Sequence, residues 1–314
     1  MKIAILGGGS WGTALAMHFA KKNYEVKVWE FVAEQAQKMQ NERTCPLLPE
    51  IKLPENIKVS SKMENVLLNA ELVLVAVPSD HVEKTVDNAA SLLVDQPIII
   101  CSKGFASNLR LLSNVVKEKV KGEVYCLYGP THAEEVCKGV ISGIVLAGGP
   151  GREELKPIIE SNYLHVDLTD DFVGVQVAAA LKNILAIYLG LADGLGLGDN
   201  TKAYLITHGL AEIKDVGLAW GAKEDTFYGL AGLGDVIVTC NSKHSRNRHV
   251  GEQLAKGLSL EEITDEMKMV AEGVNTLKTA IKLRERFALK LPLISALHEV
   301  LFEGKDPKEI ITKF

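Results

Sequence analysis

The sequence has 314 residues, of which 47% are hydrophobic and 24% are charged, and its 35 basic and 40 acidic side chains give a formal net charge of −5. This composition is typical of a globular protein with about two domains, and it excludes a disordered chain. The absence of a basic excess disfavours nucleic acid as a partner, because phosphate backbones are bound by clustered lysine and arginine side chains.

The five cysteines are scattered along the chain and odd in number, and no two of them form a C-x-x-C pair. They indicate neither a disulfide framework nor a zinc site, so we expect no metal. This use of cysteine is typical of a reducing compartment, and we therefore expect a cytoplasmic protein. Because no run of about 18 uncharged apolar residues occurs, we also expect no membrane-spanning segment.

The first half of the chain alternates short apolar runs with amphipathic stretches. Strands that are apolar throughout and separated by helices predict a parallel sheet with helices on both faces, which is a doubly wound α/β domain of the Rossmann type. The predicted strands are Ile3–Leu6, Glu25–Trp29, Leu72–Val77, Ile98–Cys101, Val124–Tyr128 and Ile144–Ala147, and the helical patterns among them are Thr13–Lys22, His81–Leu93 and Leu109–Val120.

From Phe172 onward the pattern changes to long helical stretches with glycine-rich turns, which predicts an all-α domain. The boundary falls near residue 170, so we expect an α/β domain over residues 1–170 and a helical domain over residues 171–314. The predicted helices are Val173–Leu191, Thr201–Trp220, Arg248–Lys256, Glu261–Lys268 and Asn275–Phe287.

A glycine-rich turn follows the first predicted strand and opens the first predicted helix. Gly7, Gly9 and Gly12 form the pattern G-x-G-x-x-G in the structural context that a dinucleotide site requires. Gly7 permits the tight turn, Gly9 lets a pyrophosphate approach the backbone, and Gly12 lets helix and strand pack closely. Since a helix start also offers unpaired N–H groups to phosphates, the turn predicts a dinucleotide-binding domain.

An acidic residue ends the second predicted strand. Glu30 lies 18 residues after Gly12, where a carboxylate can bind the adenosine ribose hydroxyls of NAD, and Phe31 beside it can pack on the adenine. A carboxylate at this position repels the 2′-phosphate of NADP, so Glu30 favours NAD. The alternative interpretation is a solvated glutamate that contacts no cofactor.

Lys182 is the most informative single residue. It lies in a predicted helix that is apolar nearly all round, and such a helix is buried. A buried ammonium is costly unless another group pairs with it, and burial lowers the pKa of a lysine, which suits proton transfer to a carbonyl or from an alcohol. Asn183 adds a second polar group to the same interior. The alternative is a lysine that extends from a helix edge into solvent.

Polar groups also follow the fourth and fifth predicted strands. Lys103 comes directly after one strand, and Gly129 and Thr131 come directly after the next. Ligands of open α/β sheets lie outside the carboxyl ends of the strands, so these residues are candidates for substrate contacts. An exposed solvated lysine is an equally good interpretation of Lys103 taken alone.

The segment from Asp235 to Arg248 begins with a strand-like apolar stretch and ends with Ser245-Arg246-Asn247-Arg248 before a predicted helix. A guanidinium with hydroxyl and amide donors at a helix start predicts an anion site, although a solvated polar turn has the same composition. Flexible backbone at Gly232–Gly234 allows the carboxylate of Asp235 to approach Lys182.

Together these motifs resemble one family, the NAD(P)-dependent sn-glycerol-3-phosphate dehydrogenases of the bacterial type. They occur in the order found in that family and span most of the chain. The matching segments are Gly7–Leu15 (GGGSWGTAL), Ser102-Lys103-Gly104, Gly129–Ala133 (GPTHA), Val177–Ala186 (VAAALKNILA), Gly229–Cys240 (GLAGLGDVIVTC), Ser245–Arg248 (SRNR) and Glu272-Gly273.

The resemblance implies a Rossmann domain followed by a helical domain, and the reduction of dihydroxyacetone phosphate to sn-glycerol 3-phosphate for glycerophospholipid synthesis. It implies NAD(P) as cofactor, a phosphorylated triose as substrate and a homodimer. Lys182 matches the proton donor and acceptor of the family, and Lys103 matches a residue that touches both substrate and cofactor. In the reaction we expect Lys103 and Asn183 to polarise the carbonyl and Asp235 to orient Lys182, which makes them further catalytic candidates. The matching substrate positions are Lys103, Gly129, Thr131, Lys182, Asp235, Ser245, Arg246 and Asn247, and the cofactor positions are Ser10, Trp11, Lys103, Ala133, Arg246 and Glu272, beside Gly7, Gly9, Gly12, Glu30 and Phe31.

Two alternatives remain open from the sequence. A β-hydroxyacid dehydrogenase of the same architecture also carries a lysine and an asparagine on a long helix, but it does not need the anion site around Arg246. A nucleotide-sensing protein without turnover needs no buried lysine, so Lys182 speaks against it.

Overall fold

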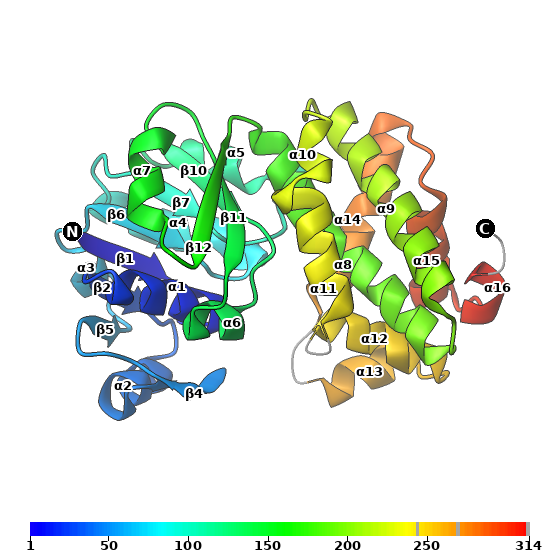
Figure 1. The fold of residues 1–314 in the computed structure, drawn as a ribbon, viewed down its shortest axis with the longest axis horizontal. Helices are drawn as coiled ribbons and strands as arrows, with labels where there is room; N and C mark the ends of the chain where they lie inside the picture. The colour runs from blue at the N-terminus through cyan, green and yellow to red at the C-terminus, as the bar shows by residue number, and fades with distance from the viewer. Residues whose placement is uncertain (243–244, 268–270, 312–314) are drawn as a thin grey trace. The chain divides into compact units, whose positions relative to one another are not determined.

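The computed structural model describes residues 1–242, 245–267 and 271–311. It divides into two compact units, Met1–Phe172 (unit 1) and Val173–Phe314 (unit 2). Unit 1 combines a mostly parallel sheet with helices, and the described part of unit 2 is helical, which confirms the predicted fold class (Figure 1).

Unit 1 is built on an eight-stranded sheet with the strand order β12-β11-β10-β7-β6-β1-β2-β5. The strands that follow β1 in the chain are added first on one side of it and then on the other. Doubly wound sheets bind their ligands at such a switch in strand order. The strands of this sheet are β1 (Lys2–Leu6), β2 (Glu25–Trp29), β5 (Ile57–Ser60), β6 (Leu72–Val75), β7 (Ile98–Ile100), β10 (Val124–Tyr128), β11 (Ser142–Ala147) and β12 (Leu164–Thr169).

The six predicted strands all lie in this sheet. Apolar runs indicate such strands because a strand covered on both faces buries every side chain. β6, β7 and β10 are buried along their whole length. Two edge strands were not predicted. β5 and β12 alternate buried and exposed side chains, so their sequences lack a continuous apolar run.

One feature of the predicted sheet is wrong, since β11 runs antiparallel to its neighbour β10 whereas the other strand pairs of this sheet are parallel. Apolar runs report burial and carry no information on strand direction, and an antiparallel strand toward the edge of a parallel sheet is common. Two short antiparallel pairs were also not predicted: β3 (Thr44–Cys45) with β4 (Leu48–Lys52), and β8 (Phe105–Ala106) with β9 (Arg110–Leu111).

The helices of unit 1 connect the strands and cover the sheet (Figure 1). Lysines at the end of the first helix bind the C-terminal ends of two others: Lys21 donates to the Cys137 carbonyl, and the C-cap residue Lys22 donates to the Pro157 carbonyl. Positive charge at the carboxyl end of a helix stabilises it. These helices are α1 (Ser10–Lys21), α2 (Ala33–Glu42), α3 (Met63–Leu67), α4 (Ser79–Ala89), α5 (Leu112–Lys117), α6 (Ala133–Lys138) and α7 (Arg152–Ile159).

Unit 2 packs its helices around α8 (Phe172–Gly194), which is buried over most of its length. Among the described residues α8 alone is long and apolar enough to cross a membrane, with a mean hydropathy of 1.7, although 89% of its most apolar window is buried inside the protein. α8 is therefore a core helix. Lys182 interrupts its apolar sequence, so the helix contains no uncharged apolar run of about 18 residues. The other helices are α9 (Asp199–Ala219), α10 (Asp225–Tyr228), α11 (Asp235–Asn241), α12 (Arg246–Ala255), α13 (Leu260–Glu266), α14 (Glu272–Phe287), α15 (Pro292–Glu303) and α16 (Pro307–Ile311).

The strand-like stretch that begins at Asp235 is a helix, α11, which corrects the prediction. Val236 and Cys240 are buried while Ile237 between them is 44% exposed, a spacing that belongs to a helix face. Its β-branched residues favour a strand locally, but tertiary packing overrides such a weak preference.

Candidate active site

The glycine-rich turn joins β1 to α1 and has the geometry of a phosphate-binding turn. Gly7 adopts a φ of +125°, and a Cβ there would lie 2.6 Å from the Ala76 carbonyl oxygen; a Cβ at Gly12 would lie 1.9 Å from the Gly7 carbonyl oxygen. A Cβ at Gly9 would meet no atom within 4 Å. Two glycines are therefore required by packing, and the third borders open space that a pyrophosphate can occupy.

The start of α1 is suited to an anion. Ser10 and Trp11 are its first residues, its first turn contains no acidic side chain, and no side chain caps its N–H groups. The Trp11 indole nitrogen is buried and has no hydrogen-bond partner among the described residues. These donors and the gap beside Gly9 fit the pyrophosphate of a dinucleotide.

Glu30 directly follows β2 and is buried beside this turn. One carboxylate oxygen accepts a hydrogen bond from the Val32 backbone N–H at 3.0 Å, and a Cβ at Gly8 would lie 2.5 Å from the other oxygen. Phe31 is 75% exposed and packs edge-on against Trp29. The carboxylate is thus held next to the turn, and an exposed aromatic ring follows it.

The candidate substrate residues of unit 1 converge on the carbonyl of Gly129, which follows β10. The half-buried Lys103, which follows β7, donates to this carbonyl over 3.4 Å, and the hydroxyl of Thr131 donates to it over 3.2 Å. Ala133 is buried at the first position of α6. Because β7 and β10 are parallel neighbours, Lys103, Gly129 and Thr131 lie at the carboxyl edge of the sheet, as expected.

In unit 2, Lys182 forms the centre of a buried polar cluster. The side chain of Lys182 is 6% exposed and that of Asp235 is 1% exposed, and the ammonium donates to the Asp235 carboxylate. The ammonium also donates to the Thr239 hydroxyl at 2.7 Å, and Thr239 lies 3.4 Å from the same carboxylate oxygen. Lys182 is therefore a core residue and not one that extends into solvent, and the expected approach of Asp235 is present.

A second polar group surrounds the start of α14. The Asn183 amide lies 3.5 Å from the Glu272 carboxylate, and Asn247 accepts a hydrogen bond from the Gly273 backbone N–H at 2.9 Å. A Cβ at Gly273 would lie 2.8 Å from both the Asn183 carbonyl and the Asn247 side chain. Gly273 thus allows α8, α12 and α14 to meet, which brings Asn183, Asn247 and Glu272 together.

The predicted anion site starts α12. Ser245 is the N-cap, and its hydroxyl accepts a hydrogen bond from the Arg248 backbone N–H at 3.3 Å, while Arg246 is exposed in the first turn. Arg248 is different, because its guanidinium is paired with Asp193 at 2.6 Å and with Glu252 at 3.0 Å. Arg246 is thus exposed at the helix start, and Arg248 ties α12 to α8.

Thr239 is the polar residue of this cluster that sequence reasoning missed. It lies four residues after Asp235, a spacing that places both side chains on one face of a helix. The signal was hidden because the segment was interpreted as a strand, in which residues four apart lie too far from each other to share one ammonium.

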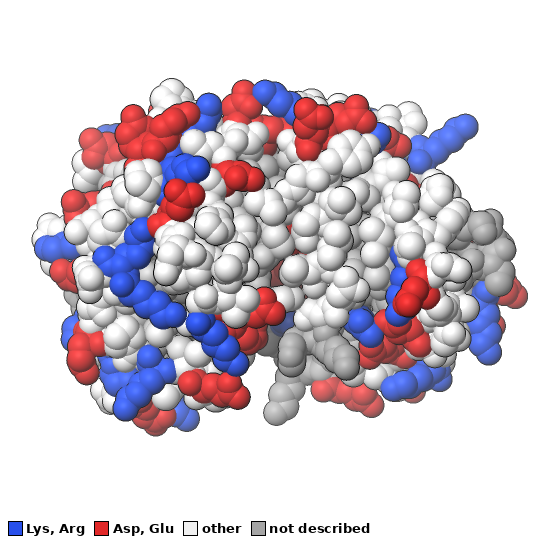
Figure 2. Space-filling view, in the orientation of Figure 1, with Lys and Arg blue, Asp and Glu red and all other residues white. Residues whose placement is uncertain are grey.

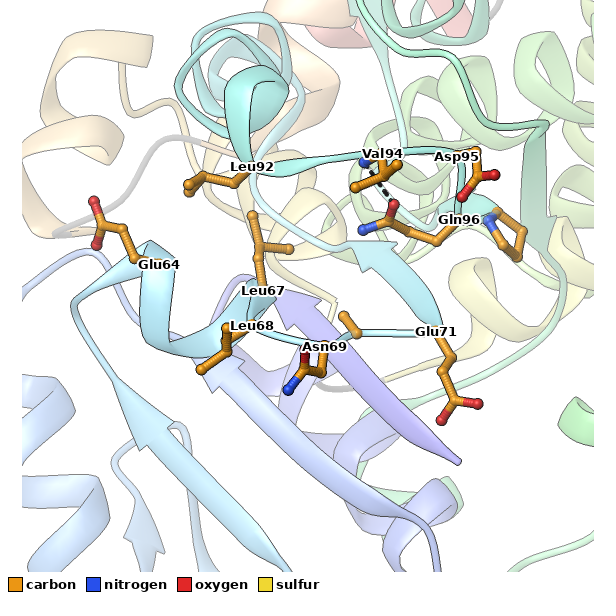
Figure 3. A pocket seen from close by; sticks show the side chains of 11 residues that line it. Glu64, Leu67, Leu68, Asn69, Glu71, Leu92, Val94, Asp95 and Gln96 are labelled. Carbon is orange, nitrogen blue, oxygen red and sulfur yellow. Dashed lines mark hydrogen bonds between the residues drawn. The ribbon is translucent and has the colours of Figure 1, made fainter.

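Other features do not add to these sites. Within the described ranges no group of three or more His, Cys, Asp or Glu side chains is placed to hold a metal. A hollow of about 750 Å³ lies before β6 and β7, at the opposite end of these strands from Lys103, and its walls include Leu67, Leu68 and Val94 (Figure 3). On the face shown in Figure 2, acidic and basic side chains are interspersed, so this face carries no continuous basic surface.

Comparison with known families covers nearly the whole chain. Residues 2–152 match the family described as NAD-dependent glycerol-3-phosphate dehydrogenase N-terminus, and residues 171–312 match NAD-dependent glycerol-3-phosphate dehydrogenase C-terminus. A protein of Thermoanaerobacter sp. (strain X514), named glycerol-3-phosphate dehydrogenase [NAD(P)+], is 39% identical over 99% of this chain and 96% of its own length.

Solved structures show the same similarity. A crystal structure of glycerol-3-phosphate dehydrogenase from Coxiella burnetii superposes with a TM-score of 0.95 at 33% identity, covering 99% of this chain and 98% of that one. A ketopantoate reductase from Ralstonia eutropha JMP134 reaches a TM-score of 0.62 at 17% identity over 100% of this chain and 99% of that one, a likeness of fold alone. The similarity over nearly the full length to proteins named glycerol-3-phosphate dehydrogenase does not favour the β-hydroxyacid dehydrogenase alternative.

Proposed function

The chain belongs to the NAD-dependent glycerol-3-phosphate dehydrogenase family, and from this premise we propose that it interconverts dihydroxyacetone phosphate and sn-glycerol 3-phosphate with Lys182 as the group that moves the proton. The observation that carries this role is the burial of Lys182 with Asp235 and Thr239 inside a helical core. An ion pair taken out of water costs several kcal/mol of desolvation, roughly, so a cluster of this kind is typical of a functional site.

A bound nicotinamide supplies or accepts the hydride at C2 of the substrate. For reduction, the Lys182 ammonium donates a proton to the oxygen that forms at C2, and for oxidation the neutral amine takes the proton back. The Asp235 carboxylate stabilises the ammonium, and the Thr239 hydroxyl limits it to one position. Lys103 and Asn183 polarise the carbonyl, and Gly129 and Thr131 complete the contacts to the substrate.

The substrate phosphate binds at the start of α12 in this proposal. Arg246 supplies an exposed guanidinium, and Ser245 caps the helix whose N–H groups face an anion. Because the side-chain oxygen Oδ1 of Asn247 accepts the Gly273 N–H, the side-chain NH₂ of Asn247 is the group available as a donor for the phosphate. Arg248 is paired with Asp193, so its role is to hold α12 in place.

The dinucleotide binds at the glycine turn. Gly7, Gly9 and Gly12 shape the turn, Ser10 and Trp11 begin the helix that receives the pyrophosphate, and the buried Glu30 accepts hydrogen bonds from the adenosine ribose. This arrangement favours NAD over NADP. The remaining cofactor contacts are Phe31, Lys103, Ala133, Arg246 and Glu272.

We also propose a physiological setting. Glycerol 3-phosphate is the backbone of glycerophospholipids, so the reaction supplies lipid synthesis. The five cysteines are free and buried, which suits the reducing cytoplasm. The family resemblance implies a homodimer.

A single assay tests the function. The absorbance of NADH falls when dihydroxyacetone phosphate is added to the purified protein, and β-ketoacids such as acetoacetate leave it unchanged. The reverse pattern contradicts the proposal and favours a β-hydroxyacid dehydrogenase. Inorganic phosphate competes with the substrate only if an anion site is used, which separates the two classes a second time.

A further inference from the structure

At the carboxyl edge of the sheet, Tyr128 and Lys103 each donate a hydrogen bond to the backbone carbonyl of a residue next to the other. The Tyr128 hydroxyl donates to the carbonyl of Ser102, the residue before Lys103, at 2.8 Å. In return the Lys103 ammonium donates to the carbonyl of Gly129, the residue after Tyr128, at 3.4 Å. Two crossing bonds therefore connect the end of β7 to the end of β10, both inside unit 1.

The hydrogen bond from the Tyr128 hydroxyl holds the Ser102 carbonyl in a fixed position. Tyr128 is 1% exposed, and burial raises the pKa of its hydroxyl well above the ordinary value because a phenolate would lose its hydration. Burial therefore favours the protonated hydroxyl, which is the form that donates. A buried hydroxyl without its acceptor is costly, so this bond resists breaking.

The backbone on both sides of Lys103 is also held. The Ser102 hydroxyl donates to the carbonyls of Val77 at 2.5 Å and Val75 at 3.3 Å, which ties the end of β7 to β6. Gly104 has a φ of +147°, and a Cβ there would lie 2.5 Å from the Ser79 side chain. With Tyr128 on the other side, the strand end that carries Lys103 is fixed from β6 and from β10.

The acceptor of the Lys103 ammonium is equally constrained. A Cβ at Gly129 would lie 2.9 Å from the Gly143 carbonyl oxygen, so the backbone of Gly129 lies directly against β11. The Gly129 carbonyl also accepts the Thr131 hydroxyl. The lysine thus binds to a part of the backbone that cannot shift without moving its neighbours.

We propose that the Tyr128 hydroxyl is a positioning residue for the reaction, which holds the Ser102–Lys103 backbone so that the Lys103 ammonium lies at the substrate. This inference rests on the role proposed above for Lys103. Tyr128 itself touches neither substrate nor cofactor in this proposal, and it acts through the Ser102 carbonyl.

The same strand offers a matched control. Tyr125 also lies in β10, is 2% exposed and donates its hydroxyl to a backbone carbonyl, that of Pro150. It lies near the amino end of the strand, away from Lys103. Tyr125→Phe and Tyr128→Phe each remove a hydroxyl that donates to a backbone carbonyl. The Tyr128 bond is buried and its hydroxyl also contacts the Cys126 thiol, whereas the Tyr125 bond is partly buried. We therefore expect a decrease of melting temperature of about 2–4 °C in both, at least as large in Tyr128→Phe.

The kinetic test is a double-mutant cycle. Tyr128→Phe should lower kcat/KM for dihydroxyacetone phosphate about three- to tenfold, the effect of losing one hydrogen bond, whereas Tyr125→Phe should leave it within twofold. In a Lys103→Met background the effect of Tyr128→Phe should disappear. A loss of the same factor in that background, or in Tyr125→Phe, would mean that Tyr128 acts through general stability and would overturn the proposal.

A second readout separates this inference from the role of Lys103. The rate of reductive methylation of the Lys103 amine, followed by peptide mass spectrometry, should rise in Tyr128→Phe and stay unchanged in Tyr125→Phe. An unchanged rate in Tyr128→Phe, together with lost activity in Lys103→Met, would refute the positioning by Tyr128 and leave the role of Lys103 intact. Full activity of Lys103→Met would instead refute that role and, with it, any catalytic consequence of Tyr128.

Discussion

The ammonium of Lys182 and the carboxylate of Asp235 form a hydrogen-bonded ion pair between two helices, α8 and α11, with almost no exposure of either side chain. Breaking a buried pair on one side leaves an uncompensated charge, whereas replacing both partners does not. The catalytic role proposed for Lys182 and its contribution to stability therefore differ, and substitutions can separate them.

We predict that Lys182→Ala lowers kcat by about 10²–10⁴-fold, the usual contribution of general acid–base catalysis, while the affinity for NADH stays nearly unchanged. The matched control is Lys202→Ala, which removes a lysine paired with Asp193 and Asp199 outside the cluster and should retain activity. Steady-state kinetics and NADH titration measure both effects. More than a tenth of the normal rate in Lys182→Ala at saturating substrate contradicts the assignment.

Stability provides the complementary measurement. Lys182→Met should lower the free energy of unfolding by about 3–5 kcal/mol, because Asp235 is left buried without its ammonium. Lys182→Met combined with Asp235→Asn should recover much of this loss without recovering activity. If the double variant is no more stable than the single one, the pair contributes little to the fold.

Glu30 leads to a prediction on cofactor choice. Its carboxylate is held beside the glycine turn by the Val32 N–H, where it can bind a ribose 2′-hydroxyl and repel a 2′-phosphate. We expect a higher kcat/KM with NADH than with NADPH, and Glu30→Gln should narrow the difference by removing the repulsion. Kinetics with both cofactors, side by side, measure this. An equal or higher value with NADPH in the unmodified protein is the contradicting result.

The parts of the fold that could be predicted are those in which one local pattern has one physical meaning. Apolar strands with helices between them indicate a doubly wound sheet, and an apolar helix that carries Lys182 indicates a buried lysine. The edge strands β5 and β12 were missed because only one of their faces is buried. The amino-acid composition of β11 does not indicate that the strand runs antiparallel to β10.

The candidate site was predictable to a similar degree. The glycine turn and Lys182 have local signals. The approach of Asp235 to Lys182 was expected from flexible glycines, but Leu230–Gly234 forms a π-helical turn, so Asp235 is placed by helical geometry. Thr239 was not predicted, since interpreting its segment as a strand removed it from the Lys182 cluster. The bond from Tyr128 to the Ser102 carbonyl joins residues 26 positions apart and depends on the neighbouring places of β7 and β10 in the sheet.

Two buried titratable groups predict opposite pH dependence in the two units. In unit 1, burial lowers the pKa of His18 from 6.5 to about 4. Below pH 6.5 His18 binds a proton in the unfolded chain but stays neutral in the folded unit. Stability is therefore lost as the pH falls from 6.5 toward 4. In unit 2, burial raises the pKa of Glu212 from 4.5 to about 7, so stability is lost as the pH rises from 4.5 toward 7.

Acidification from pH 6.5 to 4.5 should thus destabilise unit 1 and stabilise unit 2, by roughly 3 kcal/mol at most for each group. Hydrogen exchange resolved by peptide mass spectrometry follows the two units separately. His18→Gln should flatten the dependence in unit 1, and Glu212→Gln should flatten it in unit 2, where Glu212 accepts hydrogen bonds from the N–H groups of Leu293 and Ile294. Unchanged slopes in both variants would show that other groups control the pH response.

The last prediction concerns Arg246, which we expect to hold the substrate phosphate at the exposed start of α12. Binding energy from the phosphate helps to position the reacting carbon, so dihydroxyacetone, which lacks it, should react very poorly. Arg246→Ala should therefore lose far more activity with dihydroxyacetone phosphate than with dihydroxyacetone. Phosphite added with dihydroxyacetone should activate the unmodified enzyme, because it fills the anion site, and should activate the variant much less. Arg286→Ala, which removes an exposed arginine from the last turn of α14, is the control and should behave like the unmodified enzyme on both substrates. An equal loss on both substrates in Arg246→Ala would mean that Arg246 acts through the cofactor or the fold, and the phosphate would then have to bind elsewhere.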